Sequence, residues 1–313
     1  MYTSIAPYIH IARPDHWFKN IFVVPGILLA IFFDRSIMGL DIIPGVLLGF
    51  LCVCLIASSN YVLNEILDAP TDKFHPEKHN RPLPSGQAKI SVAWMVWSVL
   101  SLVSLSLGFL VNPFFGFSGV LLWVMGILYN TPPLRFKDVP YLDVLCESVN
   151  NPIRLALGWY ATGMGAAPPL SMFIAYWMFG AFLMAAKRFA EYRKIDDPDR
   201  AAKYRKSLGY YNEQRLTVSI FYYATLFALM GGYFIASYRF ELILAAPMVA
   251  YSMAFYMRLS FKKDSPVQSP ERLFRENTVM LVILTTFVLC TVLLFWDLHW
   301  LRDMFAPWIL PGR

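Results

Sequence analysis

The chain has 313 residues, of which 57% are hydrophobic and only 15% are charged, and its formal net charge is +6. A soluble domain carries about 25% charged residues, so the composition excludes an ordinary soluble protein. Together with a mean hydropathy of +0.49, the recurring apolar runs predict an all-α, polytopic membrane protein. The runs do not alternate apolar and polar residues as the strands of a membrane barrel do.

The apolar runs predict nine membrane-spanning helices, and we expect them to form one domain over residues 1–313. The predicted spans cover residues 18–34, 43–67, 90–111, 115–131, 141–163, 171–191, 217–236, 241–258 and 277–300. Several spans begin beside a proline, such as Pro44 or Pro113, because proline fits the first turn of a helix but not its interior.

The distribution of Lys and Arg predicts the orientation of the chain. All but four of the 27 are counted to one side of the predicted spans or to the helix ends that face it, with Arg154 inside the fifth span included. The four exceptions are Arg35, Arg239, Arg302 and Arg313. Because positive loops stay in the cytoplasm, we expect the N-terminus and the charged loops to be cytoplasmic. The membrane is then the inner or plasma membrane of a bacterium or archaeon.

The end of the second span carries three oxygen-bearing side chains at four-residue spacing. Asn64, Asp68 and Asp72 recur at i, i+4 and i+8, so they share one face of a helix. We expect Pro70 to kink this end and to leave Asp72 on a turn. Mg²⁺ takes one or two carboxylates together with phosphate oxygens. The spacing therefore predicts a Mg²⁺–diphosphate site, against the alternative of a solvated helix end.

Cations follow this motif directly and suit phosphate groups. We expect phosphate contacts from Lys73, Lys78 and Arg81 of this segment, and from Lys19 in the N-terminal stretch RPDHWFKN. His75 and His79 have no third nitrogen or sulfur ligand in view, so a zinc site is not expected.

A second polar stripe lies inside the fifth predicted span. It consists of Asp143, Glu147, Asn150, Asn151 and Arg154, which hold one helix face. Ionisable groups inside a membrane usually face a cavity and are functional. We therefore expect a phosphate contact from Arg154 and supporting roles for the acids and for Asn151. The alternative is an internal Glu147–Arg154 or Glu147–Asn151 pair that only holds helices together.

The sixth predicted span ends with a charged group made of Lys187, Arg188, Glu191, Arg193 and Lys194. Cations at this place can be ordinary cytoplasmic flanks. However, Lys187 and Glu191 share a helix face, and further cations follow in the loop from 192 to 216. We expect Lys187 and Arg188 to bind phosphate and Glu191 to support them.

The chain resembles the UbiA superfamily of intramembrane transferases over essentially its full length. The matching first motif runs from Asn64 to Asp72, and Glu65 stands where the family usually has Asp. Within the superfamily, the chain is most similar to the polyprenyl-phosphate (decaprenyl-phosphate) phosphoribosyltransferase branch. The pieces that carry this similarity are Arg13-Pro14 with Trp17-Phe18-Lys19-Asn20, Asp72 to Lys78 with Arg81-Pro82, Arg154 with Gly158 and Ala161 to Gly163, Lys187 to Glu191, and Arg205 to Leu208.

The resemblance implies nine helices around a central cavity, with Asn64, Asp68 and Asp72 as the catalytic group and as the ligands of Mg²⁺. Prenyltransferases of the superfamily carry a second aspartate-rich motif at the end of the sixth helix, where this chain has Lys187, Arg188 and Glu191. The replacement of those aspartates by Lys187, Arg188 and Glu191, together with the resemblance, implies transfer of 5-phosphoribose from phosphoribosyl diphosphate to a polyprenyl phosphate. The partners expected are an isoprenoid lipid, a phosphorylated donor and membrane lipids, and no nucleic acid.

Two alternatives stay open. The polar stretch from Glu147 to Asn151, the ending Leu83 to Gly86 and the stretch Tyr129 to Pro133 resemble prenyl-transferring relatives. Transfer of a prenyl group is therefore the second hypothesis, with Asp143 and Glu147 as its second acidic site. A transporter of a phosphorylated metabolite is the third, and the magnesium-type spacing and the lack of a visible inverted repeat count against it.

Overall fold

A computed structural model of the chain describes residues 5–73, 78–195, 205–262, 264–268, 273 and 276–305, with the side chains of 302 and 303 left out. In this part of the chain all regular structure is helical, and eight helical stretches are long and apolar enough to cross a membrane. The all-α, polytopic fold class is therefore confirmed. The count of nine spans is not reproduced, and a central cavity stays a prediction.

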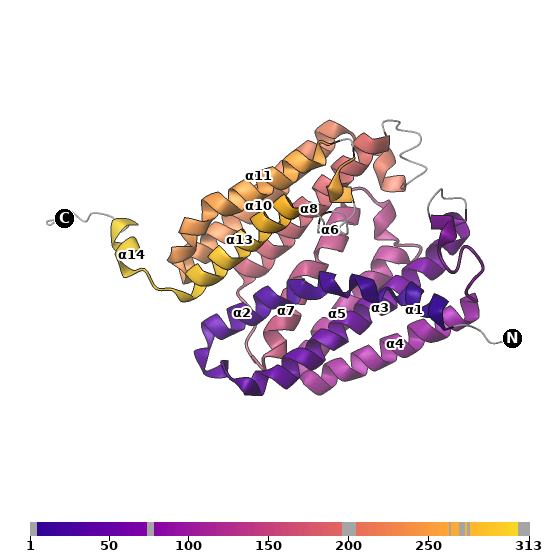
Figure 1. Cartoon of the computed structure of the whole chain (residues 1–313), viewed down its shortest axis with the longest axis horizontal. Helices are drawn as coiled ribbons and strands as arrows, with labels where there is room; N and C mark the ends of the chain where they lie inside the picture. The colour runs from indigo at the N-terminus through magenta and orange to yellow at the C-terminus, as the bar shows by residue number, and fades with distance from the viewer. Residues whose placement is uncertain are drawn as a thin grey trace. The chain divides into compact units, whose positions relative to one another are not determined.

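The first of two compact units covers Met1–Pro168 (Figure 1). Its α-helices are α1 (Ala6–Ala12), α2 (Val24–Phe33), α3 (Ile43–Asp72), α4 (Ile90–Val111), α5 (Pro113–Asn130), α6 (Leu142–Ser148) and α7 (Asn150–Ala161). Its 3₁₀ helices are η1 (Pro14–Val23), η2 (Arg35–Ile37), η3 (Leu40–Ile42), η4 (Lys78–Asn80) and η5 (Phe136–Asp138). Helices α3, α4 and α5 pack against one another, and α2 packs against α7.

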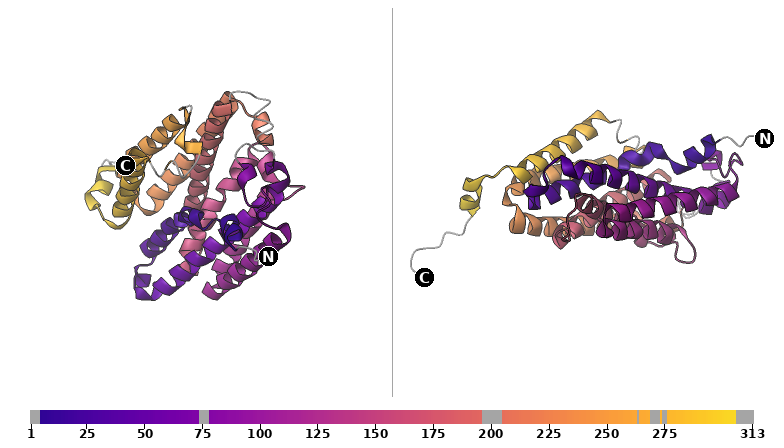
Figure 2. Two further views of the ribbon diagram at one scale, coloured as in Figure 1. Left: turned by 45° about the vertical axis from the view of Figure 1, so that its right-hand side comes forward. Right: turned by 90° about the horizontal axis from the view of Figure 1, so that it is seen from below.

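The second unit covers Pro169–Arg313, and each unit is described here by itself. Its α-helices are α8 (Leu170–Ile195), α10 (Glu213–Tyr238), α11 (Ala246–Ser260), α13 (Asn277–Phe295) and α14 (His299–Phe305). Its 3₁₀ helices are η6 (Lys206–Gly209), η7 (Phe240–Ala245) and η8 (Pro266–Gln268). The main contact joins α8 and α10, which lie side by side (Figure 2). A single domain over the whole chain stays a prediction.

The missing ninth span is the fifth predicted one, which the structure divides into α6 and α7. The break falls at Val149, three residues before Pro152. Proline has no backbone N–H, so the carbonyl of Ser148 lacks its helical donor, and the ring crowds that same carbonyl. Each piece is therefore shorter than a membrane-crossing helix, although the polar stripe of the fifth predicted span lies across both.

A direct backbone contact joins α2 to α7. A Cβ atom at Gly26 would lie 1.9 Å from the carbonyl oxygen of Leu155, and one at Gly158 would lie 2.0 Å from that of Val23. Glycine at both positions is what allows this approach. The contact borders a buried cluster that includes Val23, Val53 and Leu157. It matters for the site because α7 also carries Arg154.

Gly26→Ala is expected to lower the free energy of unfolding by about 3 kcal/mol, the upper range for overpacking a core. The added methyl group would meet a carbonyl oxygen and the backbone of α7, neither of which can move aside alone. Denaturation of the purified protein in detergent would measure the change. Gly232→Ala is the matched control, because nothing lies within 4 Å of the added atom and alanine favours a helix by about 0.5–1 kcal/mol. Equal stability of the two variants would contradict the contact.

Candidate functional site

The site is built on the last turns of α3. The helix continues through Pro70 to Asp72, so the prediction that Asp72 lies on a turn is wrong. Pro70 removes only the helical bond to the carbonyl of Ile66, and after it the hydroxyl of Thr71 donates to the carbonyl of Asp68 at 2.9 Å. The side chains of Asp68 and Asp72 are 14% and 6% exposed. Both carboxylates are therefore held close to the protein.

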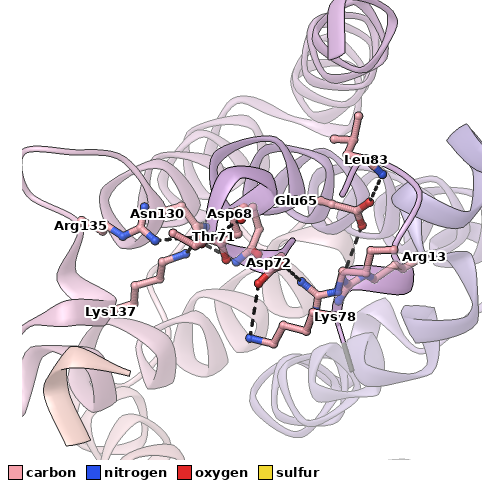
Figure 3. Close-up of polar contacts among 12 residues, drawn as sticks. Arg13, Glu65, Asp68, Thr71, Asp72, Lys78, Leu83, Asn130, Arg135 and Lys137 are labelled. Atoms are coloured by element: carbon pink, nitrogen blue, oxygen red, sulfur yellow. Dashed lines mark hydrogen bonds and ion pairs between the residues drawn. The ribbon is translucent and has the colours of Figure 1, made fainter. Parts of the chain in front are cut away.

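Two cations from the segment after α5 bind Asp68 (Figure 3). Lys137 Nζ donates to Asp68 Oδ1 at 2.6 Å, and Arg135 Nη2 donates to the same oxygen at 2.9 Å. Lys137 also donates to Asn130 Oδ1 at 3.1 Å, and Asn64 Nδ2 donates to that same amide oxygen at 2.7 Å. Asn64 therefore contacts α5 and, through Asn130, is linked to Lys137.

Arg135 and Lys137 are the functional candidates that the sequence motifs did not reveal. They lie in the loop after the fourth predicted span, on the same predicted side of the membrane as Asp68. In the sequence, only their place on the same predicted side of the membrane links these two residues to Asp68. Lys137 belongs to the few buried charged residues among those described, and burial of a Lys is unusual unless it is paired. The packing of α3 against α5 brings these residues, 67 and 69 positions from Asp68, to its carboxylate.

Asp72 faces a different set of cations. Arg81 Nη1 donates to Asp72 Oδ2 at 2.7 Å, and Lys78 Nζ lies 4.0 Å from Asp72 Oδ1. The structure thus brings two of the predicted phosphate-binding cations to the motif. Lys73 is exposed where α3 ends, and His75 lies outside the described residues.

Glu65 points away from Asp68 and Asp72. Its side chain is 1% exposed, Oε1 accepts the backbone N–H of Leu83 at 3.1 Å, and Oε2 lies 3.8 Å from Arg13 Nη2. A pocket of about 230 Å³ adjoins this carboxylate and is lined by His10, Arg13, Asp15, His16, Glu65, Arg81 and Pro82. Glu65 therefore contacts the N-terminal segment and the turn that follows η4.

The polar stripe of α6 and α7 joins several elements. Asp143 is fully buried, and Glu147 Oε2 accepts a hydrogen bond from the hydroxyl of Tyr129 at 3.0 Å. Arg154 Nε donates to Asn20 Oδ1 at 3.1 Å, which links α7 to η1. Asn151, on the first turn of α7, is partly buried. On the same N-terminal segment, Lys19 Nζ lies 3.0 Å from His16 Nδ1.

The charged group of the second unit lies on α8, as predicted. Arg188 is 1% exposed, and its Nη1 donates to Glu191 Oε2 at 2.7 Å. Glu191 therefore has a guanidinium partner on its own helix. Lys187 precedes this pair on α8. That these three residues share a chamber with Asp68 stays a prediction.

The donor atoms at the end of α3 suit Mg²⁺. Two carboxylates and the amide group of Asn64 provide hard oxygen atoms. Across the described ranges, no three His, Cys, Asp or Glu side chains form a metal-ligand group. The neighbouring Lys and Arg residues are what a phosphate ligand needs around it. Asn64, Asp68 and Asp72 therefore fit a Mg²⁺ ion whose remaining ligands are diphosphate oxygens.

Comparison with known proteins gives one family and several named relatives. The UbiA prenyltransferase family matches residues 21–280. A decaprenyl-phosphate phosphoribosyltransferase of Mycolicibacterium smegmatis is 29% identical over 225 residues, which are 68% of this chain and 64% of that protein. One of Corynebacterium glutamicum is 30% identical over 64% of this chain and 58% of that protein. The chain thus spans less than two thirds of either relative. A lycopene elongase/hydratase of Haloarcula japonica is 30% identical over 55% of each chain.

Solved structures agree in fold. A UbiA homologue from Archaeoglobus fulgidus bound to DMAPP and Mg²⁺ superposes with a TM-score of 0.67 at 19% identity, over 91% of this chain and 99% of that one. A digeranylgeranylglyceryl phosphate synthase gives a TM-score of 0.62 at 18% identity, over 93% of this chain and 99% of that one. At such identities the likeness concerns the fold alone.

Proposed function

The chain belongs to the UbiA prenyltransferase family, and from this premise we propose that it transfers 5-phosphoribose from phosphoribosyl diphosphate to a polyprenyl phosphate, with release of pyrophosphate. The protein is an integral-membrane transferase, which removes the transporter hypothesis. The names of the relatives at about 29% identity support the phosphoribosyl reading. The chain spans less than two thirds of the length of the first two of these relatives, so its substrates are proposed here from the site.

The observation that carries this proposal is the buried pair on α8. Where prenyltransferases resembling this chain hold a second metal with aspartates, Glu191 is the only acid of the group, and Arg188 already binds it at 2.7 Å. The group thus offers one acid among cations, and Lys187 and Arg188 suit the phosphate of a lipid or of a phosphorylated sugar.

The residues at the end of α3 receive the donor in this proposal. Asp68, Asp72 and Asn64 hold Mg²⁺, which when bound neutralises negative charge on a departing pyrophosphate. The cations that now contact the two carboxylates bind the oxygens of the diphosphate. These cations are Lys78, Arg81, Arg135 and Lys137. Their charge favours ionisation of the bond between ribose and pyrophosphate, which is electrostatic stabilisation at a prepared site.

The acceptor needs no general base, because a lipid phosphate is already anionic. The proposed contacts for its phosphate, or for the 5-phosphate of the donor, are Lys19, Lys73, Arg154, Lys187 and Arg188. Bringing two anions together is chiefly a matter of positioning and charge. The supporting residues proposed are Glu65, Asp143, Glu147, Asn151 and Glu191. The isoprenoid tail lies against apolar helix faces or in the bilayer.

Prenyl transfer to an aromatic or other acceptor is the second candidate. The lycopene elongase/hydratase among the relatives favours it. It would use Asp143 and Glu147 as the second acidic site. The buried position of Asp143 and the bond from Tyr129 to Glu147 count against this use. Asp143→Asn with Glu147→Gln would abolish prenyl transfer if both acids hold a metal.

Labelled phosphoribosyl diphosphate is expected to give a labelled lipid when the purified protein is supplied with Mg²⁺ and a polyprenyl phosphate. Radiolabel in the organic extract and pyrophosphate in the aqueous phase would measure the reaction. Chelation of Mg²⁺ is the control, and both signals should disappear with it. Consumption of a prenyl diphosphate with no labelled lipid from the phosphoribosyl donor would reject this function in favour of the second candidate.

A further inference from the structure

Glu65 lies beside the proposed catalytic motif in sequence, but its carboxylate faces the N–H of Leu83 and the guanidinium of Arg13. Residues next to one another on a helix point about 100° apart, so Asn64 and Glu65 face different neighbours. Asn64 contacts Asn130, which binds Lys137. Glu65 contacts the turn after η4 through the N–H of Leu83. Each of these two neighbouring side chains thus holds a segment that carries cations.

We infer that Glu65 is a positioning residue that fixes Arg81, and with it Lys78, at the diphosphate-binding site. The inference rests on the proposed function only in that the donor carries a diphosphate. Arg81 is two residues from Leu83. The bond from Leu83 N–H to Glu65 therefore fixes the position of the Arg81 backbone, from which its side chain extends. Arg81 then reaches Asp72 at 2.7 Å.

The turn from Lys78 to Ala88 is held in shape by backbone hydrogen bonds between its own residues. Arg81 N–H donates to the carbonyl of Lys78 at 3.0 Å, and Ser85 N–H donates to that of Arg81 at 3.0 Å. Ala88 N–H donates to the carbonyl of Pro82 at 3.0 Å. A segment with these internal bonds keeps its shape, so its attachment to α3 decides the position of both cations.

Glu65 has a physical reason to make this attachment. A buried carboxylate is costly unless it is paired and hydrogen-bonded, and charged acceptors form the stronger bonds to backbone N–H groups. Arg13 supplies the charge at 3.8 Å, and its guanidinium also lies 5.5 Å from the ring centre of Tyr61. The adjoining pocket of about 230 Å³ means that Arg81 is not closely packed on that side. Leu83 and Ala88 of the turn pack in a buried cluster with Ile66 and Ala69 of α3. The turn is therefore held to α3 both by this packing and by the bond to Glu65.

Binding of pyrophosphate in the presence of Mg²⁺ tests this inference, measured by calorimetry on the full-length protein in detergent. Glu65→Ala should weaken binding about tenfold, the scale of one lost charged contact. Glu65→Gln keeps an oxygen that accepts the Leu83 N–H and should restore most of the affinity. Glu65→Asp, shorter by one methylene group, should restore less. If the alanine variant does not fold, the comparison of Gln with Asp carries the test.

A double-mutant cycle separates positioning from a direct or purely structural role. In an Arg81→Gln background, Glu65→Ala should cost clearly less affinity than it does in the wild type, because only its effect through Lys78 is left. Donor KM should rise while kcat stays within about threefold in the Glu65 variants. Unchanged pyrophosphate binding in Glu65→Ala would overturn the inference, and so would losses that add fully in the double variant. The probe is pyrophosphate, so a failed phosphoribosyl assay would leave this result standing.

Discussion

Asp68→Asn is expected to reduce turnover at least a hundredfold, roughly the effect of removing one charge-stabilising group from an active site. The amide keeps the size of the side chain but removes one of the two carboxylates proposed to hold Mg²⁺. It also leaves Arg135 and Lys137 with a neutral amide oxygen in place of the charged oxygen that they share at 2.9 and 2.6 Å. Pyrophosphate release by the protein in liposomes would measure the loss, and thermal unfolding would show whether the variant is folded.

Asp138→Asn is the matched control for this change. Asp138 Oδ2 lies 3.0 Å from Nε of the same Arg135 but belongs to η5 and not to α3. The substitution removes a charge from the same guanidinium without touching the proposed metal ligands. Turnover should therefore stay within about fivefold of the wild type, as for a single ion pair near the surface. Equal losses in the two variants, or wild-type turnover in Asp68→Asn, would contradict the assignment of Asp68.

Lys137→Met is expected to weaken the binding of the donor by about ten- to a hundredfold, which is the cost of losing one charged hydrogen bond. Methionine preserves much of the buried packing, because the Lys137 side chain is only 9% exposed. The lost ammonium group serves both Asp68 and Asn130. Donor KM and the affinity for pyrophosphate with Mg²⁺ would measure the effect.

Lys89→Met provides the comparison for the removal of one positive charge. Lys89 is an exposed residue at the start of α4, on the same predicted side of the membrane. If the effect of Lys137 were only a general attraction of anions to a basic surface, both variants would lose affinity alike. The site predicts a loss confined to Lys137.

The sequence was sufficient for most of the long helices and for the place of the acidic motif at the end of one of them. Apolar runs of membrane length and prolines at helix starts predict α4 and α5 closely, since α5 begins at Pro113 with Asn112 as its cap. The break between α6 and α7 was not predicted. Its cause, Pro152, lies inside a stretch of membrane-spanning length, and the length of that stretch led to the prediction of one continuous span despite the proline.

The site itself was predicted only in part, for a geometric reason. Four residues advance the helix by slightly more than one turn, so each step rotates the side chain by about 40°. Asn64 and Asp72 therefore differ by about 80°, which turns Asn64 toward Asn130 and Asp72 toward Arg81. The contact of Lys137 with Asp68 depends on how α3 packs against α5. No local pattern in the sequence contains that information.

The glycine contact between α2 and α7 bears on how the proposed isoprenoid substrate would enter. Two backbones in direct contact, with no side chain between them, leave no room for one helix to shift against the other, because the interior of a protein is close-packed. The segment with Asn20 and the helix with Arg154 must then travel as one rigid piece, which their own bond at 3.1 Å reinforces. Any gating motion that admits an isoprenoid tail has to take place at other helix boundaries.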